Sequence, residues 1–137
     1  MSDPPGSEEK PNDNSASLRL RTGPLAAGVL GRVVSMMLAR ADCPLDRLDD
    51  AMLLCDALCA HAEAHVSDGY LNCQIKVLDG DLRLSVDELS PTGAQGLLAD
   101  AVLPGVGNVL EHVTDELHIG EDSKPGTQRL FMRLSFA

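Results

Sequence analysis

The segment that decides the fold is NCQIKVLDGDLRLSV, residues 72–86. Apolar and polar residues alternate on both sides of the central Asp79-Gly80 pair. Alternation with a period of two is typical of a strand with one buried face. The Asp-Gly pair suits a two-residue type I′ turn, because both central residues of that turn need a positive φ. The segment therefore predicts an antiparallel hairpin that pairs residues 72–77 with residues 81–86.

Further strands and helices are predicted on both sides of this hairpin from the spacing of apolar residues and from Gly and Pro breaks. The other predicted strands are residues 17–21, 116–119 and 128–136. The predicted helices are residues 25–39, 44–66, one within 94–101, and one that a Gly105-Val106-Gly107 turn opens and that runs to about residue 113. This order predicts an α+β two-layer sandwich, in which helices cover one face of a mostly antiparallel sheet.

The 137 residues divide into two parts of different composition. Residues 1–16 are rich in Pro, Ser and charged or amide residues, which cannot repay the entropy of folding, so we expect a disordered tail there. Residues 17–137 have the length and the apolar content of one folded domain.

The overall charge and the scarcity of aromatic residues argue against direct binding of nucleic acid. The chain has a formal net charge of −10 and only 2% aromatic residues. An acidic protein repels phosphate backbones, and base-stacking platforms need aromatic side chains. No apolar run approaches the roughly 20 residues that span a bilayer, and residues 1–10 do not resemble a signal peptide. We therefore expect a cytoplasmic protein that does not bind membranes.

Four cysteines lie in otherwise apolar segments, at positions 43, 55, 59 and 73. Their spacing is not that of a disulfide framework, and we expect reduced, buried thiols. Zinc would need ligands that converge on one point. On a single helix, Cys55 and Cys59 share one stripe while His61 and His65 share another, so no metal site is predicted.

The order of the predicted elements, the helix over residues 54–65, the strand that ends in Asp87 and the Gly126-Thr127 pair together resemble the anti-sigma serine kinases. These kinases have the histidine-kinase-like ATPase fold. The resemblance covers about residues 17–137 and implies that this part of the chain is such a domain.

At the catalytic positions that the resemblance identifies, this chain has other residues than the family. In that family the second helix carries a Glu that acts as general base, then an Asn that binds Mg²⁺, and often a His, each four residues apart. The corresponding residues here are Ala57, His61 and His65. Ala57 accepts no proton, and Mg²⁺ prefers hard oxygen ligands to imidazole. The resemblance therefore implies no catalytic residue, and ATP with Mg²⁺ would bind only if the degenerate site still functions.

The other family motifs are kept in part. Asp87 takes the place of the Asp that contacts adenine, although Glu-Leu-Ser-Pro follows it instead of a glycine-containing sequence; a carboxylate that begins a turn is the alternative interpretation. Gly105 and Gly107 match part of the Gly-rich lid, where a helix start would offer amide groups to phosphate. Gly126 and Thr127 match the final Gly-Thr pair, and a turn glycine before a strand is again the alternative.

Arg32 lies in the middle of the first predicted helix, where the family carries an Arg that contacts the sigma factor and its antagonist. An ordinary salt bridge is the alternative, and the nearby Met36 and Met37 are predicted to be core residues.

The resemblance implies a bacterial regulator that acts by protein binding. It would sequester a sigma factor and be released by an anti-anti-sigma partner of the STAS type. Two other functions stay open: an active ATP-dependent serine kinase of that antagonist, and a structural or assembly domain without nucleotide. A homodimer is also expected, with the first strand at a sheet edge.

Overall fold

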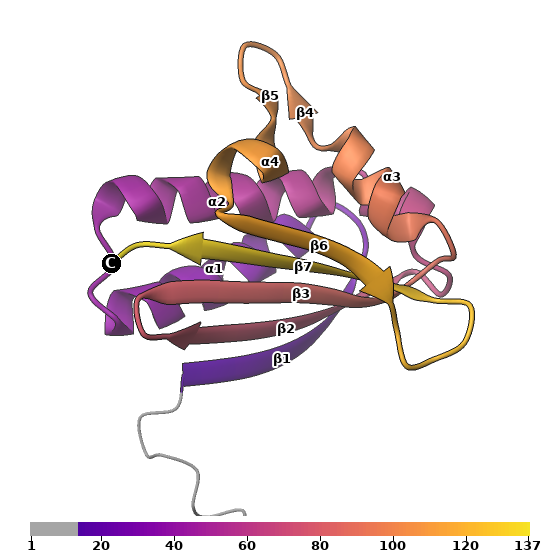
Figure 1. Ribbon diagram of the computed structural model, residues 1–137, viewed down its shortest axis with the longest axis horizontal. Coiled ribbons are helices and arrows are strands. Elements are labelled where there is room, and N and C mark those ends of the chain that lie inside the picture. Colours follow the sequence, from indigo (N-terminus) through magenta and orange to yellow (C-terminus); the bar gives the residue numbers. More distant parts are fainter. Residues whose placement is uncertain (1–13) are drawn as a thin grey trace, which may run out of the picture.

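A computed structural model describes residues 14–137 and places the predicted hairpin inside a five-stranded sheet (Figure 1). Strand β2 (Tyr70–Leu78) pairs antiparallel with β3 (Asp81–Leu89), and Leu78 lies opposite Asp81. The two turn residues, Asp79 and Gly80, have φ angles of 53° and 77°. Both angles are positive, as a type I′ turn requires, so the hairpin and its turn are confirmed.

The other strands are β1 (Asn14–Arg21), β6 (Glu116–Glu121) and β7 (Gln128–Ser135). The sheet order is β1-β2-β3-β7-β6, and every neighbouring pair is antiparallel. β1 is therefore an edge strand, as predicted. It starts three residues earlier than expected because Asn14, Ser15 and Ala16 continue the pairing with β2. Residues 1–13 of the predicted tail lie outside the described part of the chain.

Helices α1 (Ala26–Arg40) and α2 (Leu45–Ala60) lie behind the sheet in Figure 1. Two shorter helices follow β3: α3 (Gly93–Asp100) and α4 (Val109–Val113). Alternate residues of the strands and the inner stripes of the helices form one apolar core. Its largest fully buried side chains are nearly all leucines. The predicted α+β sandwich, with helices on one face of an antiparallel sheet, is thus confirmed.

The second helix ends earlier than the sequence predicts. α2 stops at Ala60, and residues Ala62–His65 form a separate 3₁₀ turn, η2. Tertiary contacts explain the break. The carbonyl of His65 accepts hydrogen bonds from the backbone N–H and the hydroxyl of Ser90, and Val66 forms a β-bridge with Leu89. A continuous helix to Val66 would not allow these pairings.

The Gly105-Val106-Gly107 segment does not open a helix as expected. It joins β4 (Val102–Leu103) to β5 (Gly107–Asn108) in a small hairpin that projects from the rest of the molecule (Figure 1). Gly105 and Gly107 have φ angles of 80° and 86°, which are not helical. α4 begins only after Asn108, whose side chain accepts a hydrogen bond from the N–H of Glu111 at 3.1 Å.

Among residues 14–137, no helix combines the length and the apolar character needed to cross a membrane.

Candidate functional site

The catalytic positions that the resemblance identifies do not share one helical face. Ala57 lies on α2 and is only 8% exposed. His61 is the residue that caps the C-terminus of α2, and it is exposed to solvent. His65 lies four residues farther on, in the 3₁₀ turn. A helix that continued to His65 would place these residues, each four apart, on one face, and the early end of α2 prevents this.

His65 makes contacts that hold the fold together. Its Nε2 lies 2.6 Å from Oδ2 of Asp100 at the end of α3, and its side chain is 16% exposed. The ring also lies against Gly96, where an added Cβ would overlap it. His65 thus joins the turn after α2 to α3, and its ring fills space that a larger residue at position 96 would need.

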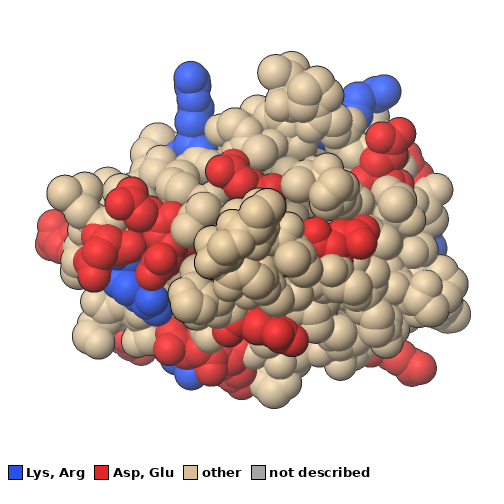
Figure 2. Space-filling view, turned by 90° about the horizontal axis from the view of Figure 1, so that it is seen from above, with Lys and Arg blue, Asp and Glu red and all other residues tan. Residues whose placement is uncertain are grey.

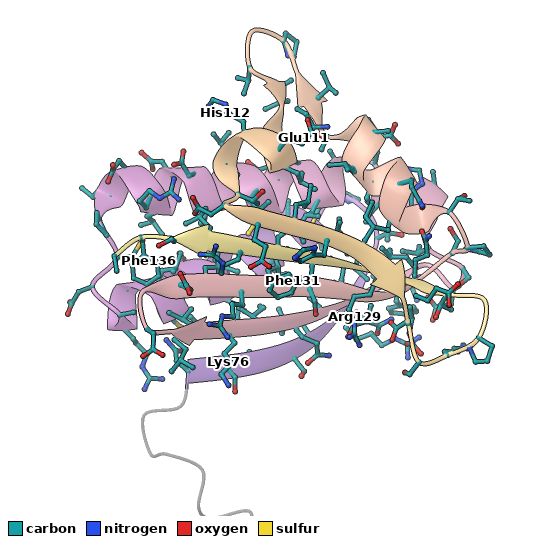
Figure 3. All side chains as sticks on the ribbon, in the orientation of Figure 1. Lys76, Glu111, His112, Arg129, Phe131 and Phe136 are labelled. Carbon is teal, nitrogen blue, oxygen red and sulfur yellow. The ribbon has the colours of Figure 1, made fainter. Side chains whose placement is uncertain are left out.

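Asp87 lies on the face of the sheet that the helices leave open. Its neighbours Val86 and Leu89 are buried in the core. The register of β3 with β7 shifts between these two residues, and Glu88 there has a positive φ of 55°. Oδ1 of Asp87 accepts a hydrogen bond from Nε of Arg129 at 2.9 Å. Figure 3 shows Arg129 near the end of the sheet where this ion pair forms. The carboxylate of Asp87 is therefore held by an arginine on the face opposite the helices.

Asp122 completes this cluster and was not singled out by the sequence. Its carboxylate accepts hydrogen bonds from the N–H groups of Glu88 (2.8 Å) and Ser123 (2.7 Å) and from Arg129 (3.2 Å). Burial by itself raises the pKa of this carboxyl group. The two backbone donors and the Arg129 charge outweigh burial, so the net effect is a lowered pKa. The only signal in the sequence is that Asp122 begins the polar turn before the last strand.

Gly126 and Thr127 close the turn between β6 and β7. Gly126 has a φ of 78°, which favours glycine. The hydroxyl of Thr127 donates to the carbonyl of Lys124 at 2.6 Å, and its own carbonyl accepts from the N–H of Asp122. The geometry of the turn by itself therefore accounts for both residues.

The predicted nucleotide-site residues line separate parts of the surface. His61 borders a hollow with Ala64 and Asp100, whereas Gly126 and Thr127 border another. Gly105 and Gly107 are exposed on the projecting hairpin, with open space beside their Cα atoms.

These residues do not fit a Mg²⁺–ATP complex. Mg²⁺ needs hard oxygen ligands, but the metal position holds the imidazole of His61. Catalysis needs a base, but the base position holds the buried methyl group of Ala57. The one carboxylate assigned to adenine, Asp87, is paired with Arg129 on the open face.

The cysteines do not form a metal site either. No group of three or more His, Cys, Asp or Glu residues in the described range is arranged to hold a metal ion. Burial raises the pKa of the Cys59 thiol to about 11 and that of Cys73 to about 12, and it raises the pKa of Cys55 further still. Thiols whose pKa is raised in this way stay protonated and unreactive at neutral pH.

The outer face of α1 is the most unusual surface near the predicted residues. Leu25, which precedes the helix, is 79% exposed, and Val29 and Met36 are 44% and 64% exposed. Arg32 lies between them, exposed, and forms no ion pair with any residue of the described chain. The prediction that Met36 is a core residue is wrong, because it lies at the helical spacing of this outer face, while Met37 is buried as predicted.

Acidic side chains dominate another face of the molecule. Figure 2 views the protein from the side of the β4–β5 hairpin, and Asp and Glu surround an uncharged protrusion. The exposed acidic residues of α2 are Asp46, Asp49 and Asp56. The hairpin exposes Val102 in β4 and Val106 in its turn. This face suits attraction of a basic partner.

The fold and these surfaces define an α+β two-layer protein whose exposed features suit contacts with other molecules. Comparison with known proteins adds no assignment, since the chain matches no known family model and no curated protein.

Proposed function

We propose that this chain is an anti-sigma-factor-like regulator that acts by binding protein rather than by catalysis. It sequesters a sigma factor, and an anti-anti-sigma protein of the STAS type releases it. The proposal combines the resemblance of residues 17–137 to the anti-sigma serine kinases with one surface of the structure.

The observation that carries the proposal is the outer face of α1. Leu25, Val29 and Met36 present apolar side chains around an Arg that has no counter-charge within residues 14–137. Removal of exposed Leu and Met side chains from water lowers the free energy, which favours binding. Arg is enriched among the residues that contribute most to the affinity of protein interfaces. A free guanidinium beside apolar contacts is suited to a carboxylate at the edge of an apolar partner surface.

Protein binding also agrees with the chemistry of the positions that the resemblance assigns to nucleotide and catalysis. Sequestration needs a complementary surface but neither a base nor a bound metal. Ala57 offers no base, and His61 offers Mg²⁺ an imidazole instead of a hard oxygen ligand, so both favour this function over an active serine kinase.

The experiment is co-expression of the affinity-tagged chain with each sigma factor of its native genome. We expect one of them to be retained. We also expect Arg32→Glu to weaken that interaction by at least about tenfold, because it removes a central charged contact and introduces repulsion. The melting temperature should change by no more than a few degrees, since Arg32 is exposed.

The matched control is Lys124→Glu, which makes the same change of charge at an exposed residue in the β6–β7 turn. It should bind as the unmodified chain does. Equal affinity of the Arg32→Glu variant would remove α1 from the interface, and retention of no sigma factor would favour a structural or assembly role.

A further inference from the structure

The open face of the sheet carries a hollow that the proposed regulatory function does not use. It has a volume of about 460 Å³ and lies over β1, β2, β3 and β7. Its lining includes Ser15, Ser17, Lys76, Arg83 and Phe131. Figure 3 shows Lys76 and Phe131 from this side of the sheet.

The strand register sets basic residues side by side on this face. Ser15 of β1 lies opposite Lys76 of β2, which lies opposite Arg83 of β3. Arg83 in turn lies opposite Arg133 of β7. Side chains directly opposite each other on neighbouring strands point to the same face and come close together. Three cations therefore form one row across the sheet of a chain whose net charge is −10.

The carboxylates near this row do not balance it. Asp81 lies 3.4 Å from Arg133 and 3.6 Å from Arg83, and Glu116 lies 3.0 Å from Arg133. No ion pair within residues 14–137 includes Lys76. Like charges directly opposite each other destabilise a sheet. An anion bound between Lys76 and Arg83 would remove that repulsion.

Arg83 has an unused donor. Its Nε is buried and has no hydrogen-bond partner in the described part of the chain. Buried polar atoms in proteins are normally paired, and one that is not needs an explanation. The Ser15 hydroxyl beside Lys76 can donate a further hydrogen bond to the same ligand.

Phe131 gives the hollow an apolar wall. It lies opposite Ser85 and is half-buried, and its ring stacks on His118 with the ring centres 6.2 Å apart. A ligand whose flat apolar part packs on this wall would place its charged end in the neighbouring row, beside Lys76 and Arg83.

We propose that this hollow binds a small phosphate-bearing molecule with a flat apolar part. The phosphate lies between Lys76 and Arg83, and the flat part lies on Phe131. Arginine and lysine together with a hydroxyl match the several acceptor oxygens of a phosphate group. The site is on the opposite face of the sheet from the helices, and it does not depend on the proposed regulatory function.

Titration of the full chain with phenyl phosphate, followed by backbone and side-chain NMR, tests the proposal. Saturable shifts are expected at Lys76, Arg83 and Phe131, with weaker binding of inorganic phosphate and none of phenol. Lys76→Met should weaken phenyl phosphate binding by at least about tenfold. Lys124→Met, the matched control, should not.

The melting temperature without ligand is a second measurement. Lys76→Met should leave it unchanged or raise it, because the substitution removes a cation opposite Arg83. The proposal is overturned if millimolar phenyl phosphate gives no saturable shifts, or if Lys76→Met binds it as well as the unmodified chain. Binding to phosphatidic acid vesicles without binding of phenyl phosphate would likewise overturn it, in favour of a membrane surface.

Discussion

Asp122→Asn should destabilise the protein, because this carboxylate fixes the irregular end of β3. It holds the N–H of Glu88, a residue with a positive φ, and the N–H of Ser123, and its side chain is 3% exposed. An asparagine keeps only one acceptor oxygen, so its amide group must face one of these two N–H donors. Loss of one hydrogen bond to a charged group costs about 1.5–3 kcal/mol.

The ion pair with Arg129 adds little to this value. The Arg129 side chain is 48% exposed, and pairs of that kind contribute less than about 1 kcal/mol. We therefore expect Asp122→Asn to lower the free energy of unfolding by about 2 kcal/mol. For a domain of this size the melting temperature should fall by about 8 °C at pH 7.

The dependence on pH supplies a second readout. The folded pKa of Asp122 lies below its ordinary value of 3.8, so the carboxylate stabilises the protein above that pH. This stability is lost as the pH falls through the folded pKa. The gap between the unmodified chain and Asp122→Asn should therefore shrink below about pH 4.

Thermal unfolding monitored by circular dichroism from pH 7 to pH 3 measures both effects. Asp49→Asn is the control, because Asp49 is an exposed carboxylate on α2 and its neighbour Asp50, not Asp49, forms the ion pair with Arg47. It should change stability by less than about 0.5 kcal/mol. If Asp122→Asn melts at the same temperature as the control at pH 7, or if the gap stays constant down to pH 3, Asp122 does not stabilise the end of β3 in this way.

Three other predictions concern packing and burial. Gly96→Ala should lower the melting temperature, because the added Cβ would overlap the His65 ring. Gly28→Ala should raise the melting temperature slightly, because Gly28 is an exposed helical residue with open space around it. Calorimetry compares the two variants. Ala57→Glu should lower the free energy of unfolding in urea by about 3 kcal/mol, because it buries a carboxyl group. A variant as stable as the unmodified chain would show that position 57 is more open than its burial indicates. In the folded protein, iodoacetamide should modify half-buried Cys43 before the three buried cysteines, and mass spectrometry would expose any other order.

The sequence predicted the fold well where local chemistry and tertiary structure agree. The Asp79-Gly80 turn and its alternating flanks predict one register, and the structure has it. The end of α2 was not predictable, because the break depends on hydrogen bonds to Ser90, which is 25 residues from His65. The helix start predicted at Gly105-Val106-Gly107 was wrong, because these glycines fit a helix start as well as a hairpin until their φ angles are known.

The candidate site was less predictable than the fold. Motif matching placed Asp87 beside a nucleotide, yet period-two alternation puts it on the face opposite the buried Val86 and Leu84. Its partner Arg129 is 42 residues away, and their meeting depends on the pairing of β3 with β7. The row of Lys76 and Arg83 follows from the hairpin register alone and was within reach of the sequence.

We propose regulation by protein binding without nucleotide chemistry, and run-off transcription tests this proposal most directly. The unmodified chain, added in excess to RNA polymerase with its sigma factor, should inhibit transcripts from that factor's promoters, and the STAS protein should restore them. Because ATP is a transcription substrate, the complexes should be formed before nucleotides are added. Arg32→Glu should lose most of the inhibition, while Lys124→Glu retains it. Inhibition that first requires incubation with ATP and Mg²⁺, or release that depends on phosphate transfer to the STAS protein, would contradict the account.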